Sequence, residues 1–465
     1  MLNQVEYYAH PAVRRRIAEY CGGDPDHSAG MTAEYLVGFG ECLLWDGRAE
    51  PFLSVDTSRF HELLDRGLDV FRSNWDAVAT LGVLDIEYFN NDYPGEIYLR
   101  PQRCFALLEP VRLAVRAVFS EYGIPFLEIM TGQGYHFTTR VLRNSAADEG
   151  LIRIGRVRDT LAGKYAHPTG RRKRRVSIFH GRSFDGMGRL MEFVAHQVIR
   201  RARDRSRLPI VTTDVAVGPG RCGREAVSID LSMYADPIHM RDIRTAFSTH
   251  QKHKVFREKV GRGIADGTPV QTCFPTGSMT LYERLRMRRH FRWTAEWAQS
   301  CGPMTIPVGN AGILRLLRAY RSSRLYRFHR EFDSVDHDHW TRWSETYDRF
   351  DLSRIPPCVR EILLRPNPNI LKPTNIQTLV RVLLSLGWHP KHVAGLIRSK
   401  LERDYGWTED WTKYDAGSRA DFYVRLFAGQ LRCGLDGLAD HNCVSHQEKG
   451  YCVESWCGYS LGNYR

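Results

Sequence analysis

The sequence lacks long apolar runs, low-complexity tracts, internal repeats and an N-terminal export signal. No apolar stretch reaches the roughly 18 residues that a membrane-spanning helix needs. The first residues, MLNQVEYYAHPAVRRR, do not show the charged-then-apolar pattern of a secretory signal. These absences argue against a membrane-spanning or exported protein. They predict a globular chain that stays in the cytoplasm.

Length and charge narrow the class further. A chain of 465 residues is too long for one ordinary core, so two or three domains are expected. Lys and Arg number 66 against 53 Asp and Glu, a formal charge of +13. Such an excess suits a polyanionic partner, because each neutralised phosphate releases condensed counterions. A protein that is merely basic remains the alternative, and charge alone does not choose between them.

The order of strand-like and helix-like stretches predicts an α+β fold for the first region, residues 1–275. The expected helices cover 12–20, 60–75 and 105–123, and the expected strands cover 79–89, 123–130 and 225–234. A second region, 276–345, is rich in Arg and aromatic residues at helical spacing, as in 281–299 and 312–332. It is a basic helical linker, either a positively charged bridge or a set of solvated helix faces. The third region, 346–465, is mostly helical and rich in cysteine.

An acidic pair lies in an apolar run that predicts a buried strand, 83–89. Residues two apart on a strand share a face, so Asp85 and Glu87 are expected to project together. Two such carboxylates can bind a pair of divalent cations that activate an attacking oxygen. Asp230 interrupts a second apolar run, where a charge is costly unless it is paired or coordinated. An edge strand with a polar face, and a turn residue at 230, are the alternatives.

Two further segments carry groups suited to phosphate. In the first, Gly132 and Gly134 let the backbone approach a ligand, and His136 returns to a strand pattern where it can donate to phosphate. A core histidine beside a hairpin turn explains this segment equally well. The second, 244–254, concentrates Arg, Ser, His and Lys, which triphosphate binding requires. A surface loop with spare cations is the alternative.

The order of these motifs resembles the archaeo-eukaryotic primase superfamily over about residues 60–260. That family has an acidic pair, a Ser-Gly-rich turn ending in His, a lone Asp, and a loop like Arg-Leu-Pro-Gly-Ser-Leu-His-x-Lys. Here Thr131 replaces the usual Ser, and Thr245-Ala246-Phe247 replaces Leu-Pro-Gly. The resemblance implies an RRM-like catalytic sheet with a flanking αβ unit, and an enzyme that joins nucleotides on single-stranded DNA to make or extend primers.

The resemblance also implies roles for individual residues. Two Mg²⁺ or Mn²⁺ ions would be bound by Asp85, Glu87 and Asp230. The incoming NTP or dNTP would be held by Thr131, Gly132, Gly134, His136, Arg244, Ser248, His250 and Lys252. A helicase or a replicative polymerase is a possible partner. The alternatives are a repair or bypass polymerase without priming, a metal-dependent nuclease, and a non-catalytic replication-initiation protein that binds nucleic acid.

Five of the eleven cysteines fall in the last quarter of the chain: Cys358, Cys433, Cys443, Cys452 and Cys457. Four thiolates suit zinc or an iron–sulfur cluster, but the tight Cys-x-x-Cys pattern of zinc knuckles is absent. Buried free thiols are the alternative. The Pro-Pro-Cys turn and the Cys-rich end resemble the C-terminal domain of primase large subunits, over about residues 350–460. That resemblance implies a [4Fe-4S] cluster on Cys358, Cys443, Cys452 and Cys457, with Cys433 as alternate.

Overall fold

The computed structural model describes residues 2–168, 174–213, 225–238, 242–364, 372–403, 415–438 and 440–465. These residues form three sheets and many helices, so the chain is α+β as the sequence predicts. Within the described ranges, no helix is both long enough and apolar enough to cross a membrane.

The largest sheet has six strands. They are β4 (Ala79–Asn90), β5 (Leu127–Met130), β6 (Gly134–Leu142), β7 (Ile210–Thr212), β8 (Glu225–Asp230) and β12 (Phe274–Pro275). Their order is β12-β5-β6-β4-β8-β7, with β7 parallel to β8 and the other pairs antiparallel. β4 is the longest strand and pairs on both edges, which places its central residues in the middle of the sheet.

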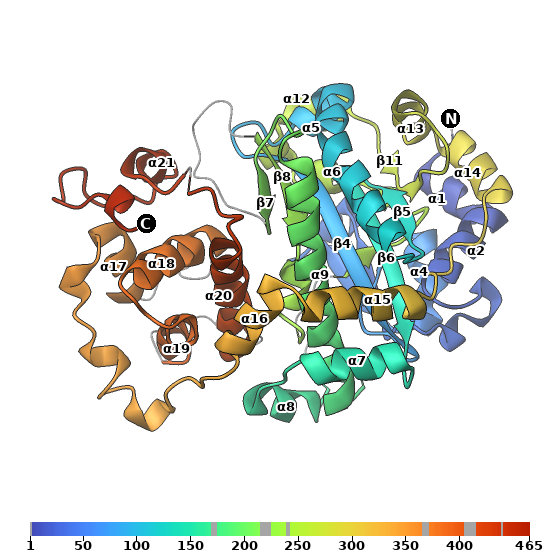
Figure 1. Cartoon of the computed structure of the whole chain (residues 1–465). Helices are drawn as coiled ribbons and strands as arrows, with labels where there is room; N and C mark the ends of the chain where they lie inside the picture. The colour runs from blue at the N-terminus through green and yellow to red at the C-terminus, as the bar shows by residue number, and fades with distance from the viewer. Residues whose placement is uncertain are drawn as a thin grey trace.

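Two long helices cover one face of this sheet (Figure 1). α6 (Pro101–Glu121) connects β4 to β5, and α9 (Ile178–Ala202) lies between β6 and β8 in the chain. Strands β8-β4-β6-β5 with these two crossovers therefore make a βαββαβ unit. Met187 of α9 lies against Gly82 of β4, so the even-numbered residues of β4 face the helices. Asp85 and Glu87, being odd-numbered, lie on the opposite face.

A smaller sheet near the N-terminus has the order β2-β1-β3-β9. Its strands are β1 (Leu36–Phe39), β2 (Phe52–Val55), β3 (Asp69–Arg72) and β9 (Ile243–Arg244). β10 (Thr249–His250) pairs with β11 (Gln271–Thr272). Around them lie α1 (Gln4–Ala9), α2 (Pro11–Tyr20), α3 (Glu41–Trp45), α4 (Phe60–Asp65), α5 (Glu96–Leu99), α10 (Lys252–Val255), α11 (Arg257–Val260) and α12 (Arg262–Gly267).

One predicted helix is wrong in its second half. The sequence predicts a single helix over 60–75, but the structure has α4 and then strand β3. Gly67 causes the break, because it adopts a left-handed φ of +64° that ends a helix. The amides of Gly67 and Leu68 then bond to the carbonyls of the last helical turn. The residues that follow β-pair with β1 and β9 instead of continuing the helix.

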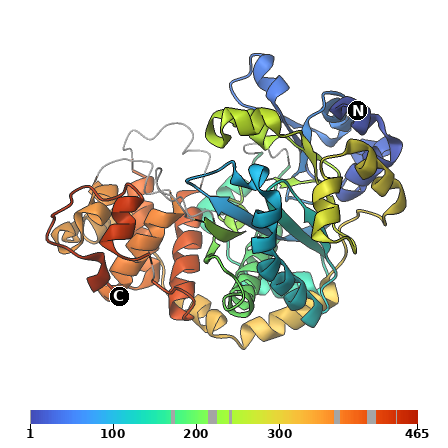
Figure 2. The same ribbon diagram turned by 90° about the horizontal axis from the view of Figure 1, so that it is seen from above.

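The remaining helices include α7 (Ala146–Ile154) and α8 (Asp159–Tyr165), which lie beside α9. The linker region contains α13 (Leu281–Met287), α14 (Phe291–Ser300), α15 (Asn310–Arg321) and α16 (Arg324–Phe332). The C-terminal helices are α17 (Pro357–Leu364), α18 (Pro373–Ser385), α19 (Pro390–Leu401), α20 (Ala416–Arg432) and α21 (Cys443–Glu448). They gather to one side of the sheet, whereas α13 and α14 lie near the N-terminus (Figure 2). α20 joins the two parts, since Gln430 donates to Thr212 of β7 at 2.6 Å.

Candidate active site

Three predicted site residues form a row across three adjacent strands. Asp85 of β4 is the register partner of Asp230 on β8 and of His136 on β6. Directly opposed residues of an antiparallel pair lie side by side on the same face, with Cβ atoms about 4.5–5.5 Å apart. Glu87, two residues along β4, shares that face. The strand pairing therefore brings together the acidic pair, the lone Asp and the His.

Within this row, the Asp85 carboxylate is incompletely satisfied. His136 Nε2 lies 3.4 Å from Asp85 Oδ2. Within the described parts of the chain, Asp85 has no other ion-pair partner. Asp85 Oδ1 is buried without a hydrogen-bond partner there. Burial would lower the pKa of His136, but the neighbouring carboxylates, first Asp85 and then Glu87, together outweigh it and raise that pKa. A buried carboxylate oxygen left unsatisfied is a group that a cation would stabilise.

The fit to divalent cations rests on donor chemistry and register. Carboxylate oxygens are the ligands that Mg²⁺ and Mn²⁺ prefer. Asp230 Oδ1 accepts the amide of Ser232 at 2.8 Å, which orients that carboxylate at the end of β8. In the described residues, no three His, Cys, Asp or Glu side chains already stand in a metal-binding group. The residues on this face fit the cations, and coordination would require their side chains to converge.

The glycine turn, residues 131–134, joins this row of strand residues to the basic loop, residues 244–254. Thr131 Oγ1 accepts the amide of Gly134 at 3.1 Å, which closes the turn between β5 and β6. A Cβ added at Gly134 would lie 1.8 Å from the carbonyl oxygen of Ile86, so only glycine fits against β4. A Cβ at Gly132 would lie 2.3 Å from the His250 ring. The two glycines therefore allow β4 on one side and the basic loop on the other to approach closely.

Two basic-loop residues reach this turn. Lys252 Nζ donates to Gln133 Oε1 at 2.6 Å, and the His250 ring lies over Gly132. The pKa of His250 lies well below its ordinary value, because the ring is buried and the nearby cations, first Arg244, repel a further proton. His250 is therefore a neutral ring at neutral pH, and Lys252 is a cation beside the turn.

Arg244 and Ser248 are occupied inside the loop itself. Arg244 Nη1 lies 2.5 Å from Asp69 Oδ2 and donates to the Thr249 carbonyl at 2.6 Å. Ser248 Oγ accepts the Val70 amide at 2.8 Å and donates to the Thr249 carbonyl at 2.9 Å. Both side chains are buried. Both side chains hold the loop against β3. That they bind a triphosphate remains a prediction.

Phe247 occupies the loop position where the primase pattern has glycine. Its φ is +62°, a left-handed conformation that costs a non-glycine residue about 1 kcal/mol or more. The side chain is fully buried, and its amide donates to the Cys273 carbonyl at 2.6 Å. Packing and this hydrogen bond hold in place a backbone shape that glycine would adopt freely.

Comparison of the chain with protein-family models, curated proteins and solved structures finds no match. The assignment of this site depends on its residues and their geometry.

Two residues at the site were not identified from the sequence. Asp69 is completely buried and accepts from Thr249 Oγ1 at 2.7 Å and from the Gln251 amide at 3.0 Å. Its signal was an Asp between apolar neighbours, as at Asp230, but the predicted helix over 60–75 concealed it. Arg288 is also buried, donates to the Gly132 carbonyl at 3.4 Å, and has a pKa that burial lowers to about 10. Nothing in the sequence distinguishes it from the other arginines of its segment.

The predicted cysteine ligands meet in the C-terminal part. One small cavity is lined by Cys358, Cys443, Cys452 and Cys457. Burial raises the pKa of Cys358 to about 12, and the three neighbouring thiols add to the effect. Cys433 does not line this cavity; it follows the end of α20 near Glu192. Four sulfur donors around one cavity suit a zinc ion or an iron–sulfur cluster, and binding would require these side chains to converge, as on the sheet.

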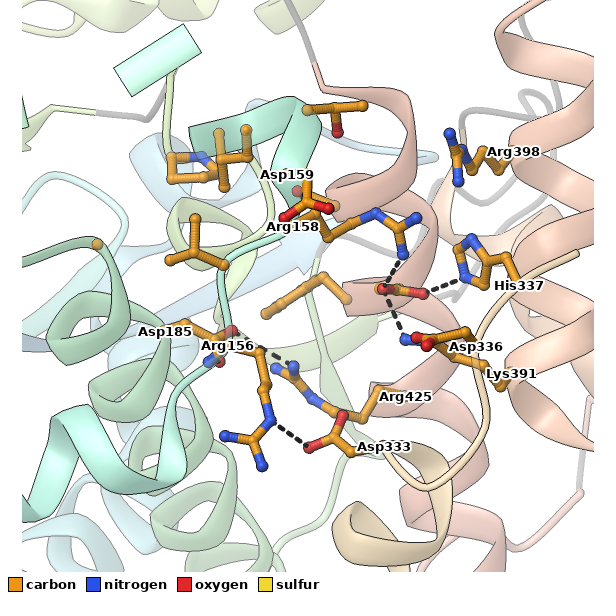
Figure 3. A pocket seen from close by; sticks show the side chains of 18 of the residues that line it. Arg156, Arg158, Asp159, Asp185, Asp333, Asp336, His337, Lys391, Arg398 and Arg425 are labelled. Atoms are coloured by element: carbon orange, nitrogen blue, oxygen red, sulfur yellow. Dashed lines mark hydrogen bonds and ion pairs between the residues drawn. The ribbon is translucent and has the colours of Figure 1, made fainter. Parts of the chain in front are cut away.

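A cavity of about 740 Å³ lies between the α8–α9 segment and α19–α20 (Figure 3). Several of its charged groups are paired with one another. Asp421 lies 3.0 Å from Arg158, 2.6 Å from His337 and 2.9 Å from Lys391. These three neighbours hold the pKa of Asp421 well below its ordinary value, against the opposing effect of burial. None of the predicted site residues lines this cavity, and its ion pairs stabilise the contact between the two parts of the chain.

Proposed function

We propose that this chain catalyses template-directed nucleotidyl transfer on single-stranded DNA, making or extending primers by a two-metal mechanism. The single observation that carries the proposal is the register of Asp85 with Asp230 and His136 on three adjacent strands. The βαββαβ order of the sheet supports the RRM-like core that the primase resemblance implies. The left-handed Phe247 at the family's glycine position supports the same assignment.

The chemistry follows from the groups on this face. Asp85, Glu87 and Asp230 would hold two Mg²⁺ or Mn²⁺ ions. When bound, these ions favour the deprotonated 3′-hydroxyl and neutralise the leaving pyrophosphate. The 3′-oxygen forms a bond to the α-phosphorus as the bond from that phosphorus to pyrophosphate breaks. Lys252 and His250 would bind the triphosphate, and His136 would donate to it from the end of the carboxylate row.

The rest of the chain has an expected part in this activity. Residues 1–275 would be the catalytic domain, 276–345 a basic helical linker, and 346–465 a cysteine-rich domain that helps grip the template and the initiating nucleotide. The meeting of Cys358, Cys443, Cys452 and Cys457 around one cavity supports a bound metal group there. A [4Fe-4S] cluster is the group that the resemblance implies, and zinc is the alternative.

The metal group can be identified directly. Protein purified without oxygen should be brown and contain iron and acid-labile sulfide. Cys443→Ser should lose both, whereas Cys433→Ser should keep them, because Cys433 lies outside the cavity. A colourless protein that contains zinc would replace the cluster with a zinc site and leave the polymerase proposal intact.

The activity is tested by primer synthesis on unprimed circular single-stranded DNA. Labelled NTPs or dNTPs are supplied with Mg²⁺ or Mn²⁺, and Asp85→Asn serves as the control. New oligonucleotides that disappear with the variant would establish priming and reveal the preferred sugar. Extension of a supplied primer without new primers would indicate a polymerase that does not initiate. Failure of both assays would overturn the proposal in favour of a non-catalytic nucleic-acid-binding protein.

A further inference from the structure

The segment formed by α13, the following turn and the start of α14 has two different faces. Its inner face touches the candidate active site. Arg284 Nη1 donates to the hydroxyl of Tyr135, the residue before His136, at 2.8 Å. Arg288, in the turn, donates to the carbonyl of Gly132 at 3.4 Å. The segment is therefore anchored directly behind the glycine turn.

The outer face carries exposed aromatic rings separated by a guanidinium group. Tyr282 is 61% exposed and Trp293 is 37% exposed. The guanidinium carbon of Arg286 lies 5.6 Å from the Tyr282 ring centre and 5.2 Å from that of Trp293. The rings of His290 and Trp293 are 4.2 Å apart. We call this exposed set, with Arg289, the α13–α14 patch: Tyr282, Arg286, Arg289, His290 and Trp293.

The patch has positive charge that is not neutralised locally. In the described part of the chain, Arg286 and Arg289 have no carboxylate within ion-pair distance. The two nearby acids are engaged elsewhere. Glu283 accepts from the amide and hydroxyl of Thr280 at the start of α13, and Glu296 pairs with Arg292 at 3.1 Å. An anion approaching the patch meets two unpaired guanidinium groups.

This combination distinguishes the patch from a merely solvated helix face. Single exposed rings are ordinary on a solvated face. Here two rings flank one guanidinium group and a third ring lies against one of them, and clustered exposed apolar surface marks an interaction site. Surfaces that bind single strands combine cations for the phosphates with rings on which bases stack, and each stacked base is worth about 1–3 kcal/mol. A duplex does not offer its bases for stacking, because they are already stacked on one another.

We propose that the α13–α14 patch binds single-stranded nucleic acid. The bases would stack on Tyr282 and Trp293, and the phosphates would contact Arg286 and Arg289. A helix is about 10–12 Å across, so a strand on the outer face passes within that distance of the Gly132 turn. The assignment of this strand as template or primer rests on the proposed function. The binding itself does not depend on it.

The test measures fluorescence anisotropy of labelled single-stranded DNA, single-stranded RNA and duplex DNA, without nucleotide or metal. The full chain is compared with Tyr282→Ala/Trp293→Ala, whose matched control is Trp45→Ala, another exposed ring. Loss of one to two stacked bases should weaken single-strand binding about 10- to 100-fold or more. The control should bind like the unaltered chain. Thermal unfolding checks that the exposed substitutions leave the fold intact.

The charge contribution is separated by salt dependence. Arg286→Ala/Arg289→Ala should reduce the slope of log affinity against log salt by about 0.7 for each phosphate that the protein no longer neutralises. Arg153→Ala/Arg262→Ala removes the same charge from two exposed arginines that are ion-paired, and should leave the slope unchanged.

The proposal would be overturned if the patch variants bound single strands as tightly as their controls do. It would also be overturned if the patch variants lost affinity for duplex DNA and kept their affinity for single strands. RNA bound as well as DNA supports it, because the stacking chemistry is shared. Asp85→Asn should bind as the unaltered chain does, so a failure of catalysis and a failure of the patch are distinguishable.

Discussion

Two regions of the molecule bury carboxylates and treat them in opposite ways. At the interface cavity, Asp421 has three partners within 3.0 Å: the cations Arg158 and Lys391, and the ring of His337. On the central sheet, Asp85 has His136 at 3.4 Å, and its other oxygen is buried without a hydrogen bond in the described residues. Matched charges hold two parts of a chain together. A carboxylate that is left short of a cation sacrifices stability and is suited to bind one.

Helix α9 separates these regions and serves both. Met187 packs on β4, while Asp185 and Arg189 line the interface cavity. Arg189 reaches Asp333 at 2.7 Å and Asp185 at 2.8 Å. Because the helix is rigid and packed on both sides, the ion pairs of the interface support the sheet that positions the carboxylate row. The comparison predicts that substitutions in the two regions will separate activity from stability.

The largest effect is expected at the carboxylate row. Glu87→Gln keeps the shape of the side chain and removes the charge that would bind a cation. Primer extension should fall by on the order of 10³-fold, since metal-mediated charge stabilisation contributes several kcal/mol to such reactions. Any loss of unfolding free energy, measured in urea, should stay near about 1 kcal/mol, the contribution of a single interaction. A variant whose lost activity is explained by general unfolding would contradict the proposed role.

The interface should respond in the opposite way. Asp421→Ala leaves Arg158, His337 and Lys391 without their common partner and should destabilise the protein by about 3–5 kcal/mol. Asp204→Ala removes an exposed carboxylate, 85% accessible and 3.6 Å from Arg203, and should cost less than about 1 kcal/mol. Urea unfolding measures both variants. Equal losses of unfolding free energy in the two variants would show that the ion pairs of Asp421 contribute no more to stability than a surface pair does.

Gly134→Ala tests whether the close approach of β6 to β4 aligns the row. The added Cβ would lie 1.8 Å from the Ile86 carbonyl oxygen, and the forced shift should cost about 3 kcal/mol and reduce primer extension. Gly163→Ala is the matched control, because its Cβ meets no atom within 4 Å inside α8. That change should stabilise the chain by up to about 1 kcal/mol. A tolerated Gly134→Ala would remove the argument for close approach.

The smallest effect is on the pH dependence of stability, and it arises from His196 of α9. Burial lowers the pKa of His196 to about 4, from about 6.5 in an unfolded chain. The unfolded state therefore binds the proton first on acidification, and stability falls with pH below about 6.5. Between about pH 7 and pH 5 this group should remove about 2 kcal/mol.

His196→Leu should flatten that part of the profile, measured as urea midpoint against pH. An unaltered profile in His196→Leu would show that another group takes up the proton.

Local patterns predicted much of the candidate site. The apolar run around Asp85 indicated a strand, and strand periodicity put Glu87 on the same face, as found in β4. The same reasoning failed over 60–75, where the helical pattern continued through Gly67 and concealed Asp69. Periodicity describes the neighbours along the chain, whereas β3 forms because β1 and β9 pair with it. Those partners are distant in sequence, and no local signal announces them.

The groups available for chemistry can be read from the residues alone: the carboxylates, the glycines that permit close approach, the basic loop and the late cysteines. Which of these groups meet depends on the fold. Strand register brought His136 and Asp230 to either side of Asp85 and turned Arg244 toward Asp69. The packing of the C-terminal helices left Cys433 outside the cavity of the other thiols. Residue type and spacing act over a few positions, whereas pairing and burial depend on segments that only folding brings together.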